Sequence, residues 1–113
     1  MSPHSFFKSQ RLLRKEEFRG VLDHGYCVRT RRFIIFVRPN VFGHPRLGLI
    51  VTRKIANSVY RNRIKRLVRE YFRTVYVEKM RHVRGHDVVF IAKRGADLLE
   101  LVEFDREVRG LYE

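Results

Sequence analysis

The residues of this chain best suited to chemistry are clustered cations. Eight Lys or Arg side chains and one carboxylate, Glu70, lie between positions 53 and 73. Guanidinium groups are planar forks that bind phosphate oxygens in pairs and stack on nucleobases. Because the segment offers almost no carboxylate to pair with these cations, the chemistry they indicate is recognition of a phosphate backbone rather than a solvated helix face.

Residues suited to acid–base or metal catalysis are sparse. Six carboxylates lie before residue 96, and Glu16 and Glu17, the only close pair, do not face each other on a helix. His82 and His86 have a helical spacing, but Gly85 interrupts a helix there, and no Cys or carboxylate other than Asp87 lies nearby to complete a zinc ligand set. We therefore predict no catalytic side chain and no metal ligand, and a protein-only nuclease is the least favoured function.

Composition describes one compact and strongly basic domain, covering residues 1–113. The 113 residues carry a net charge of +13 and are 44% hydrophobic, enough for a core without a metal or disulfide. A single cysteine, Cys27, and the absence of a secretory signal favour the cytoplasm, and no apolar run reaches membrane length. Residues 96–113 carry two basic and six acidic side chains, so we expect a polyanion to bind elsewhere.

Three apolar runs predict strands. FIIFVR at 33–38 and LGLIVT at 47–52 are separated by turn-forming residues, which predicts a hairpin between them. DVVFIA at 87–92 is the third clear strand, and residues 26–29 are extended by weak preference.

Helical periodicity marks three other segments. Phe18, Val21 and Leu22 have helical spacing within residues 15–23, before Gly25. Asn57 or Ser58 is suited to capping a long helix that runs to about Met80. Gly95 introduces a last helix whose apolar stripe comprises Leu101, Phe104, Val108, Leu111 and Tyr112. The predicted fold is an α+β class, single-domain α/β sandwich in the order α-β-β-β-α-β-α.

The long helix is predicted to have two distinct faces. Its apolar residues occupy less than half of the circumference, and its cations collect on the opposite side. We therefore predict a helix that packs on the sheet and presents a cationic strip for nucleic acid.

Segment 46–73, RLGLIVTRKIANSVYRNRIKRLVREYFR, resembles the signature of the bacterial ribonuclease P protein component, whose hallmark is the Arg-Asn-Arg core, here Arg61, Asn62 and Arg63. Residues 11–25, RLLRKEEFRGVLDHG, are similar to the amino-terminal helix of that family. The resemblance extends from Arg11 to about Ala92.

The resemblance implies a non-catalytic subunit of a ribozyme. A large ribonuclease P RNA, with Mg²⁺ bound mainly by RNA and none by the protein alone, removes the 5′ leader of precursor tRNA. It further implies a left-handed βαβ crossover, no requirement for a protein oligomer and no membrane partner. The residues implied to bind the RNA subunit are Arg53, Lys54, Asn57, Arg61, Asn62, Arg63, Lys65, Arg66 and Arg69.

A second implied surface is a cleft between the sheet and the first helix, which takes the single-stranded leader. Aromatic faces stack on unpaired bases with little sequence preference, while cations follow the backbone. The matching positions are Arg11, Lys15, Phe18, Leu22, Arg29, Arg31 and Phe36.

Two alternatives stay open from the residues themselves. Phe18 and Leu22 have the spacing of ordinary core residues, and alternate residues of the strand at 33–38 must also face a core. A ribosomal or nucleoid protein would use the same basic helix on structured RNA or DNA.

Overall fold

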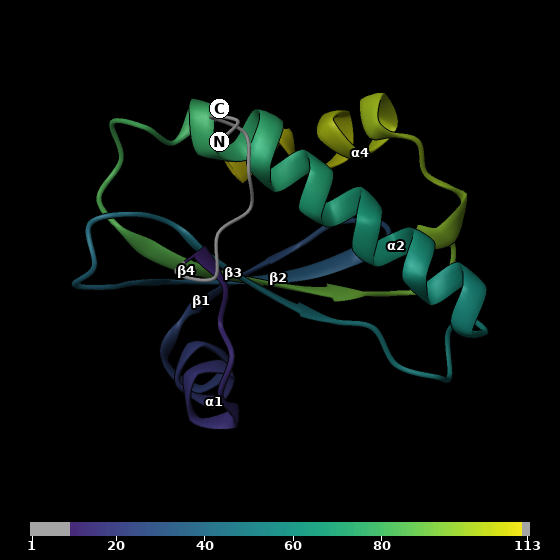
Figure 1. Ribbon diagram of the computed structural model, residues 1–113, viewed down its shortest axis with the longest axis horizontal. Coiled ribbons are helices and arrows are strands. Elements are labelled where there is room, and N and C mark those ends of the chain that lie inside the picture. Colours follow the sequence, from purple (N-terminus) through teal and green to yellow (C-terminus); the bar gives the residue numbers. More distant parts are fainter. Residues whose placement is uncertain (1–9, 112–113) are drawn as a thin grey trace.

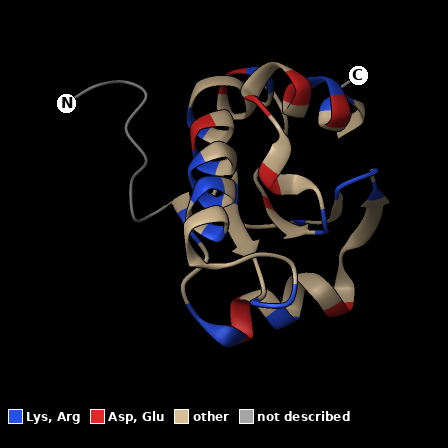
Figure 2. Ribbon diagram, turned by 90° about the vertical axis from the view of Figure 1, so that its right-hand side faces the viewer, with Lys and Arg blue, Asp and Glu red and all other residues tan. Residues whose placement is uncertain are grey.

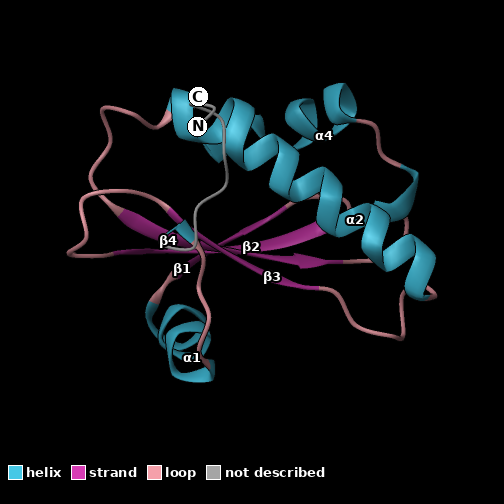
Figure 3. Cartoon of the chain, viewed as in Figure 1, coloured by secondary structure: helices cyan, strands magenta, loops and turns pink. Residues whose placement is uncertain are grey.

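A computed structural model describes residues 10–111 as one four-stranded sheet between two layers of helices (Figure 1). The predicted order of elements is confirmed. One face of the sheet carries α2 (Ser58–Tyr71) and α4 (Leu101–Val108), and the other carries α1 (Lys15–His24), as the colouring of Figure 3 makes plain. The strands are β1 (Tyr26–Arg29), β2 (Phe33–Pro39), β3 (Arg46–Ile50) and β4 (His86–Ala92).

The pairing of the strands corrects one prediction. The sheet order is β1-β2-β4-β3, so β2 and β3 do not form a hairpin and β4 lies between them. The hairpin is formed by β1 and β2 instead, through the short turn at residues 30–32. β3 and β4 are parallel and are joined through α2, which makes a βαβ unit. The left-handed sense of its crossover stays a prediction.

The long helix begins where the capping residue predicts. The side chain of Asn57 accepts a hydrogen bond from the backbone N–H of Tyr60 at 3.1 Å. α2 continues through a π-helical turn, η2 (Phe72–Tyr76), into a final helical turn, α3 (Val77–Lys79). The predicted end near Met80 is therefore confirmed, with a π turn that places Phe72 and Tyr76 in the core.

The main core lies between the sheet and α2 with α4. Alternate residues of β2 and β4 are buried there, together with Ile64, Val68 and Tyr71 of α2. Phe104 and Val108 of α4 are buried in the same core. Leu101 and Leu111, also predicted for the C-terminal apolar stripe, are half-buried against this core. Tyr112, the remaining residue of that stripe, lies outside the described residues.

Two further features limit what the fold can do. Within residues 10–111, no helix has the length and apolar character needed to cross a membrane. η3 (Ala96–Leu98) and α4, which carry four of the acidic residues, both pack against α2, so this acidic part of the chain lies on the same side of the sheet as that helix (Figure 2).

Candidate nucleic-acid interfaces

The predicted RNA-subunit residues follow one another along α2 and the turn before it (Figure 2). Arg53 and Lys54 are exposed in the turn after β3. Asn57 is the helix cap, so its side chain is committed to the backbone of Tyr60. The members on the outer side of the helix, which we call the α2 strip, are Arg61, Asn62, Lys65, Arg66 and Arg69.

The buried apolar face of α2 orients the α2 strip away from the sheet. Ile64 and Val68 are buried in the core, so the intervening residues must face away from the sheet. Arg66 and Arg69 are exposed, and Arg61 and Lys65 are half-buried. In the part of the chain that the structure describes, none of these four cations forms an ion pair. Their charge therefore has no counter-charge among residues 10–111.

Arg63 differs from its neighbours. It lies on the side of α2 that faces α4, where its guanidinium donates to Glu100 Oε1 at 2.8 Å. Both side chains are at least half exposed, at 50% and 73%, so the pair contributes little to stability and an RNA phosphate can replace the carboxylate. Arg73, further along the helix, is likewise paired, with Glu70.

The opposite face of the sheet is organised in rows across the four strands. Cross-strand pairing places one residue of each strand side by side. One row is Cys27, Phe36, Val89 and Gly48, and the next is Arg29, Ile34, Ile91 and Ile50.

Helix α1 covers only part of these rows. Val21 and Leu12 are buried with Val89, whereas the remaining apolar side chains of the rows stay half-buried. We call these residues the open sheet face: Ile34, Phe36, Ile50 and Ile91. Half-exposed apolar side chains on a sheet in a protein of high positive charge form a platform on which unpaired bases can stack.

The predicted leader residues are partly brought together. Phe18, Leu22 and Phe36 belong to one apolar cluster with Ile50 and Ile91. A groove of about 660 Å³ between α1 and β3 is lined by Lys15, Phe18 and Leu22, and also by Arg19, which the prediction missed.

The remaining predicted cations do not line that groove. Arg29 ends β1 in the same row as Ile34, and Arg31 lies in the turn that follows; both are exposed. Arg11, also exposed, is fixed by a parallel bridge to Leu47 at the edge of the sheet. The sequence prediction also missed Ile34, Ile50 and Ile91, although the alternation of side chains along the predicted strands could have indicated that they lie on the outer face.

The position of α1 depends on a network of charges. Arg46 donates two hydrogen bonds to Asp87, at 2.8 and 2.9 Å, and a third to Glu17 Oε2 at 2.8 Å. Glu17 Oε1 accepts the backbone N–H groups of Leu13 and Arg14, both at 2.9 Å, at the start of α1.

These interactions shift the ionisation of both partners. The two backbone donors and Arg46 hold the pKa of Glu17 below its usual value. The hydrogen bonds and charge of Asp87, with those of Glu17, raise the pKa of Arg46. Both shifts favour the charged forms of Glu17 and Arg46, and the network joins the first turn of α1 to β3 and β4.

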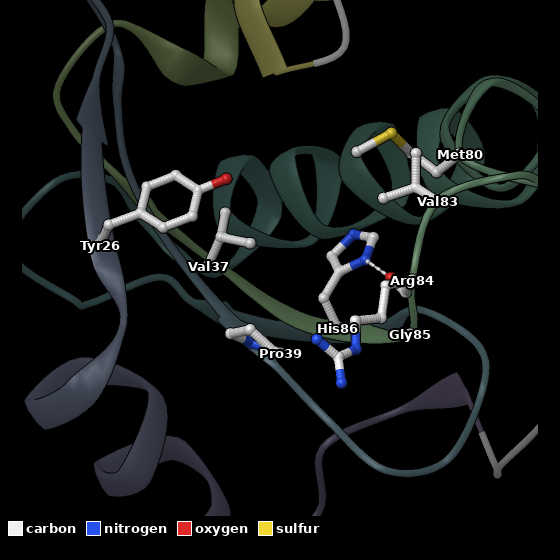
Figure 4. A pocket seen from close by; sticks show the side chains of 8 residues that line it. All are labelled: Tyr26, Val37, Pro39, Met80, Val83, Arg84, Gly85 and His86. Atoms are coloured by element: carbon white, nitrogen blue, oxygen red, sulfur yellow. Dashed lines mark hydrogen bonds between the residues drawn. The ribbon is translucent and has the colours of Figure 1, made fainter.

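A smaller pocket of about 150 Å³ lies beside the first residue of β1, Tyr26, and the last residues of β2 (Figure 4). Its walls are mainly apolar, with Tyr26 on one side and Met80 and Val83 on the other. Its buried polar residue is His86, whose Nδ1 donates to the Arg84 carbonyl at 2.9 Å while Nε2 accepts from the Tyr76 hydroxyl at 2.7 Å. Burial raises the pKa of Tyr76, which keeps it a donor. Both ring nitrogens are thus occupied, so His86 has none left for a ligand.

The described residues do not fit a resident metal ion. Between positions 10 and 111, no three His, Cys, Asp or Glu side chains converge on a site that could hold one. The carboxylates of Glu17 and Asp87 are both engaged with Arg46.

Comparison with known proteins decides the family. A family model described as Ribonuclease P matches residues 6–113. The chain is 40% identical over 101 residues to the ribonuclease P protein component of Syntrophus aciditrophicus, covering 89% of this chain and 82% of the relative. The chain belongs to the ribonuclease P protein family.

Other ribonuclease P proteins match this chain in sequence and in structure over nearly its full length. The protein component of Geotalea uraniireducens is 36% identical over 113 residues, covering 100% of this chain and 96% of that relative. The structure of the Staphylococcus aureus ribonuclease P protein is similar, with a TM-score of 0.76, 30% identity and coverage of 91% of this chain and 92% of that one.

Family membership settles the general function. The chain is the protein subunit of ribonuclease P, an endoribonuclease and ribonucleoprotein of tRNA processing, and it has an RNA partner. A ribosomal or nucleoid role is not favoured.

Proposed function

We propose that this ribonuclease P protein binds the ribonuclease P RNA through the α2 strip and the 5′ leader of precursor tRNA through α1 and the open sheet face. The RNA carries out the hydrolysis that releases the leader. In this account the chain acts as a single RNA-binding domain in the cytoplasm, and it requires no second copy of itself.

The observation that carries the proposal is the unpaired charge of the α2 strip. Arg61, Lys65, Arg66 and Arg69 make no ion pair within the described residues, although α2 packs against α4, a helix that carries acidic side chains. Holding four like charges on one helix costs self-repulsion, which a phosphate backbone relieves. Arg53, Lys54 and Arg63 extend the α2 strip around the first turns of α2.

Leader binding is supported by the chemistry of the second face. Phe18 and Phe36 offer rings, and the isoleucines of the open sheet face offer flat apolar contact, all of which tolerate any base. Lys15 and Arg19 beside the groove and Arg29 in the adjoining row supply cations for the backbone. Arg11 and Arg31 complete the set. Such a surface suits a substrate segment whose sequence varies.

Magnesium belongs to the RNA in this proposal. Ribonuclease P is an Mg²⁺-dependent ribonucleoprotein, and the described residues of the protein offer no cluster of ligands for the ion. The protein's own contribution is to neutralise phosphates and to hold the leader, and both effects reduce the ionic requirement of the assembled particle.

Reconstitution from purified components tests the proposal. The protein alone is expected to leave precursor tRNA intact. Added to the ribonuclease P RNA, it is expected to lower the Mg²⁺ or substrate concentration needed for leader removal. Cleavage of precursor tRNA by the protein without RNA would contradict the proposal, as would Mg²⁺ and substrate requirements that both stay unchanged.

A further inference from the structure

Glu107 of α4 holds the turn between β1 and β2. Its Oε2 accepts hydrogen bonds from the Thr30 hydroxyl at 2.7 Å and from the Arg32 backbone N–H at 2.9 Å. Its Oε1 pairs with the Arg32 guanidinium at 3.3 Å. The Glu107 side chain is only 12% exposed, so these bonds are shielded from water.

The same turn is fixed from the sheet side. The backbone N–H of Thr30 donates to the Phe33 carbonyl, and that of Lys93 donates to the Arg32 carbonyl, both at 2.8 Å. Arg32 is thereby committed to the fold on both its backbone and its side chain. Its neighbours in the turn region, Arg29 and Arg31, are exposed and form no ion pair with any described residue.

We propose that Glu107 is a positioning residue for leader recognition: it locks the β1–β2 turn so that Arg29 and Arg31 stand ready for phosphates at the end of the open sheet face. This inference rests on the proposed function. It assigns a role to one acidic residue of the C-terminal segment. It predicts that removal of this carboxylate weakens leader recognition. Charge alone predicts the opposite, because a carboxylate near an RNA-binding turn repels RNA.

The test compares binding of precursor and mature tRNA by the particle reconstituted with ribonuclease P RNA. Glu107→Ala removes all three bonds to the turn, and we expect the preference for precursor over mature tRNA to fall by about fivefold, because the two arginines are then no longer preorganised for phosphate. Glu107→Gln is expected to keep most of the preference, since its amide oxygen still accepts from Thr30 and Arg32. Thr30→Val leaves α4 unaltered but removes the hydroxyl that donates to Glu107 and accepts from the Phe33 backbone N–H at 3.1 Å, and it is expected to reduce the preference by about twofold.

Glu103→Gln is the matched control for charge. Glu103 lies one helical turn earlier on α4, is exposed, and makes no bond with the described residues. Because it changes the net charge by the same amount as the Glu107 variants, it is expected to leave the preference unchanged or to strengthen binding of both tRNAs slightly.

A double-mutant cycle separates this inference from the proposed function. If Glu107 acts through the two arginines, adding Glu107→Ala to Arg29→Ala/Arg31→Ala causes no further decrease in preference. Full additivity, or a Glu107→Ala particle with the same preference as Glu103→Gln, would overturn the inference. Arg29→Ala/Arg31→Ala particles with normal preference would instead contradict the leader contacts of the proposed function.

Discussion

The ring of Phe18 lies so close to the backbone of Gly48 that a Cβ at position 48 would come within 2.7 Å of Phe18 Cε1. Gly48 is the middle residue of β3, and Phe18 belongs to the helix that forms one wall of the groove between α1 and β3. The absence of a side chain on β3 therefore sets the depth at which α1 rests on the sheet.

Gly48→Ala is expected to destabilise the protein by about 1 to 3 kcal/mol, because the new methyl group meets both Phe18 and Leu12 and α1 must shift outward. Urea unfolding measures this change. Gly110→Ala is the control, since a Cβ there has nothing within 4 Å. Equal stability of the two variants would show that α1 adjusts without strain.

Phe18→Ala is expected to reduce the preference of the reconstituted particle for precursor over mature tRNA, because only the precursor has a leader to stack on this ring. Phe18→Leu keeps the apolar contact with Gly48 and should restore stability but not the whole preference. The measurement is the ratio of the two dissociation constants. An equal weakening for both tRNAs would assign Phe18 a role in folding alone.

Arg46→Met is expected to cost about 3 to 5 kcal/mol in the free energy of unfolding, because it leaves the Asp87 carboxylate without its charged partner in a buried site. Asp87→Asn in the Arg46→Met background should recover part of this stability, since the amide needs no counter-charge. Urea unfolding of the two single variants and the double variant gives the coupling. Simple additivity would mean that the pair does not act as a unit.

Glu17 predicts a pH dependence of stability. Its pKa is lowered in the folded protein, first by the backbone N–H groups of Arg14 and Leu13, so the unfolded chain binds the proton more readily. The stabilisation is therefore complete above the ordinary carboxyl pKa of 4.5 and is lost as pH falls through the folded value. Glu17→Gln should cost up to about 1 kcal/mol at pH 7 and almost nothing well below that range.

The control for this titration is Glu16→Gln. Glu16 is exposed in the same first turn and makes no bond with the described residues, so its replacement should leave the pH profile nearly unchanged. Urea unfolding across the acid range compares the three proteins. A profile of Glu17→Gln parallel to that of the parent protein would contradict the role of Glu17.

The helices were predictable because their signals are local. Asn57 caps α2, and the apolar spacing of Ile64, Val68 and Tyr71 orients that helix and exposes the α2 strip. The resemblance, in turn, brought Phe18, Leu22 and Phe36 into consideration, and the structure places all three in one cluster.

The order of the strands was not predictable in the same way. An apolar run indicates a strand but does not say which neighbour it pairs with, so β2 and β3 were wrongly expected to form a hairpin. The true order depends on β4, which comes much later in the chain and inserts between them. The rows that contain Gly48, Ile50 and Ile91 exist only in that order, so alternation could indicate which side chains of a strand share a face but not which strands lie side by side.

The most direct test of the account is the salt dependence of binding to ribonuclease P RNA. For Arg61→Ala/Arg66→Ala the slope of log affinity against log salt should flatten by about 1.5, or roughly 0.7 to 0.9 for each phosphate that is no longer neutralised. Arg94→Ala/Arg106→Ala removes the same charge from exposed sites outside α2 and should change the slope far less. Equal slopes for the Arg61→Ala/Arg66→Ala variant and the parent protein would contradict the claim that α2 binds the RNA.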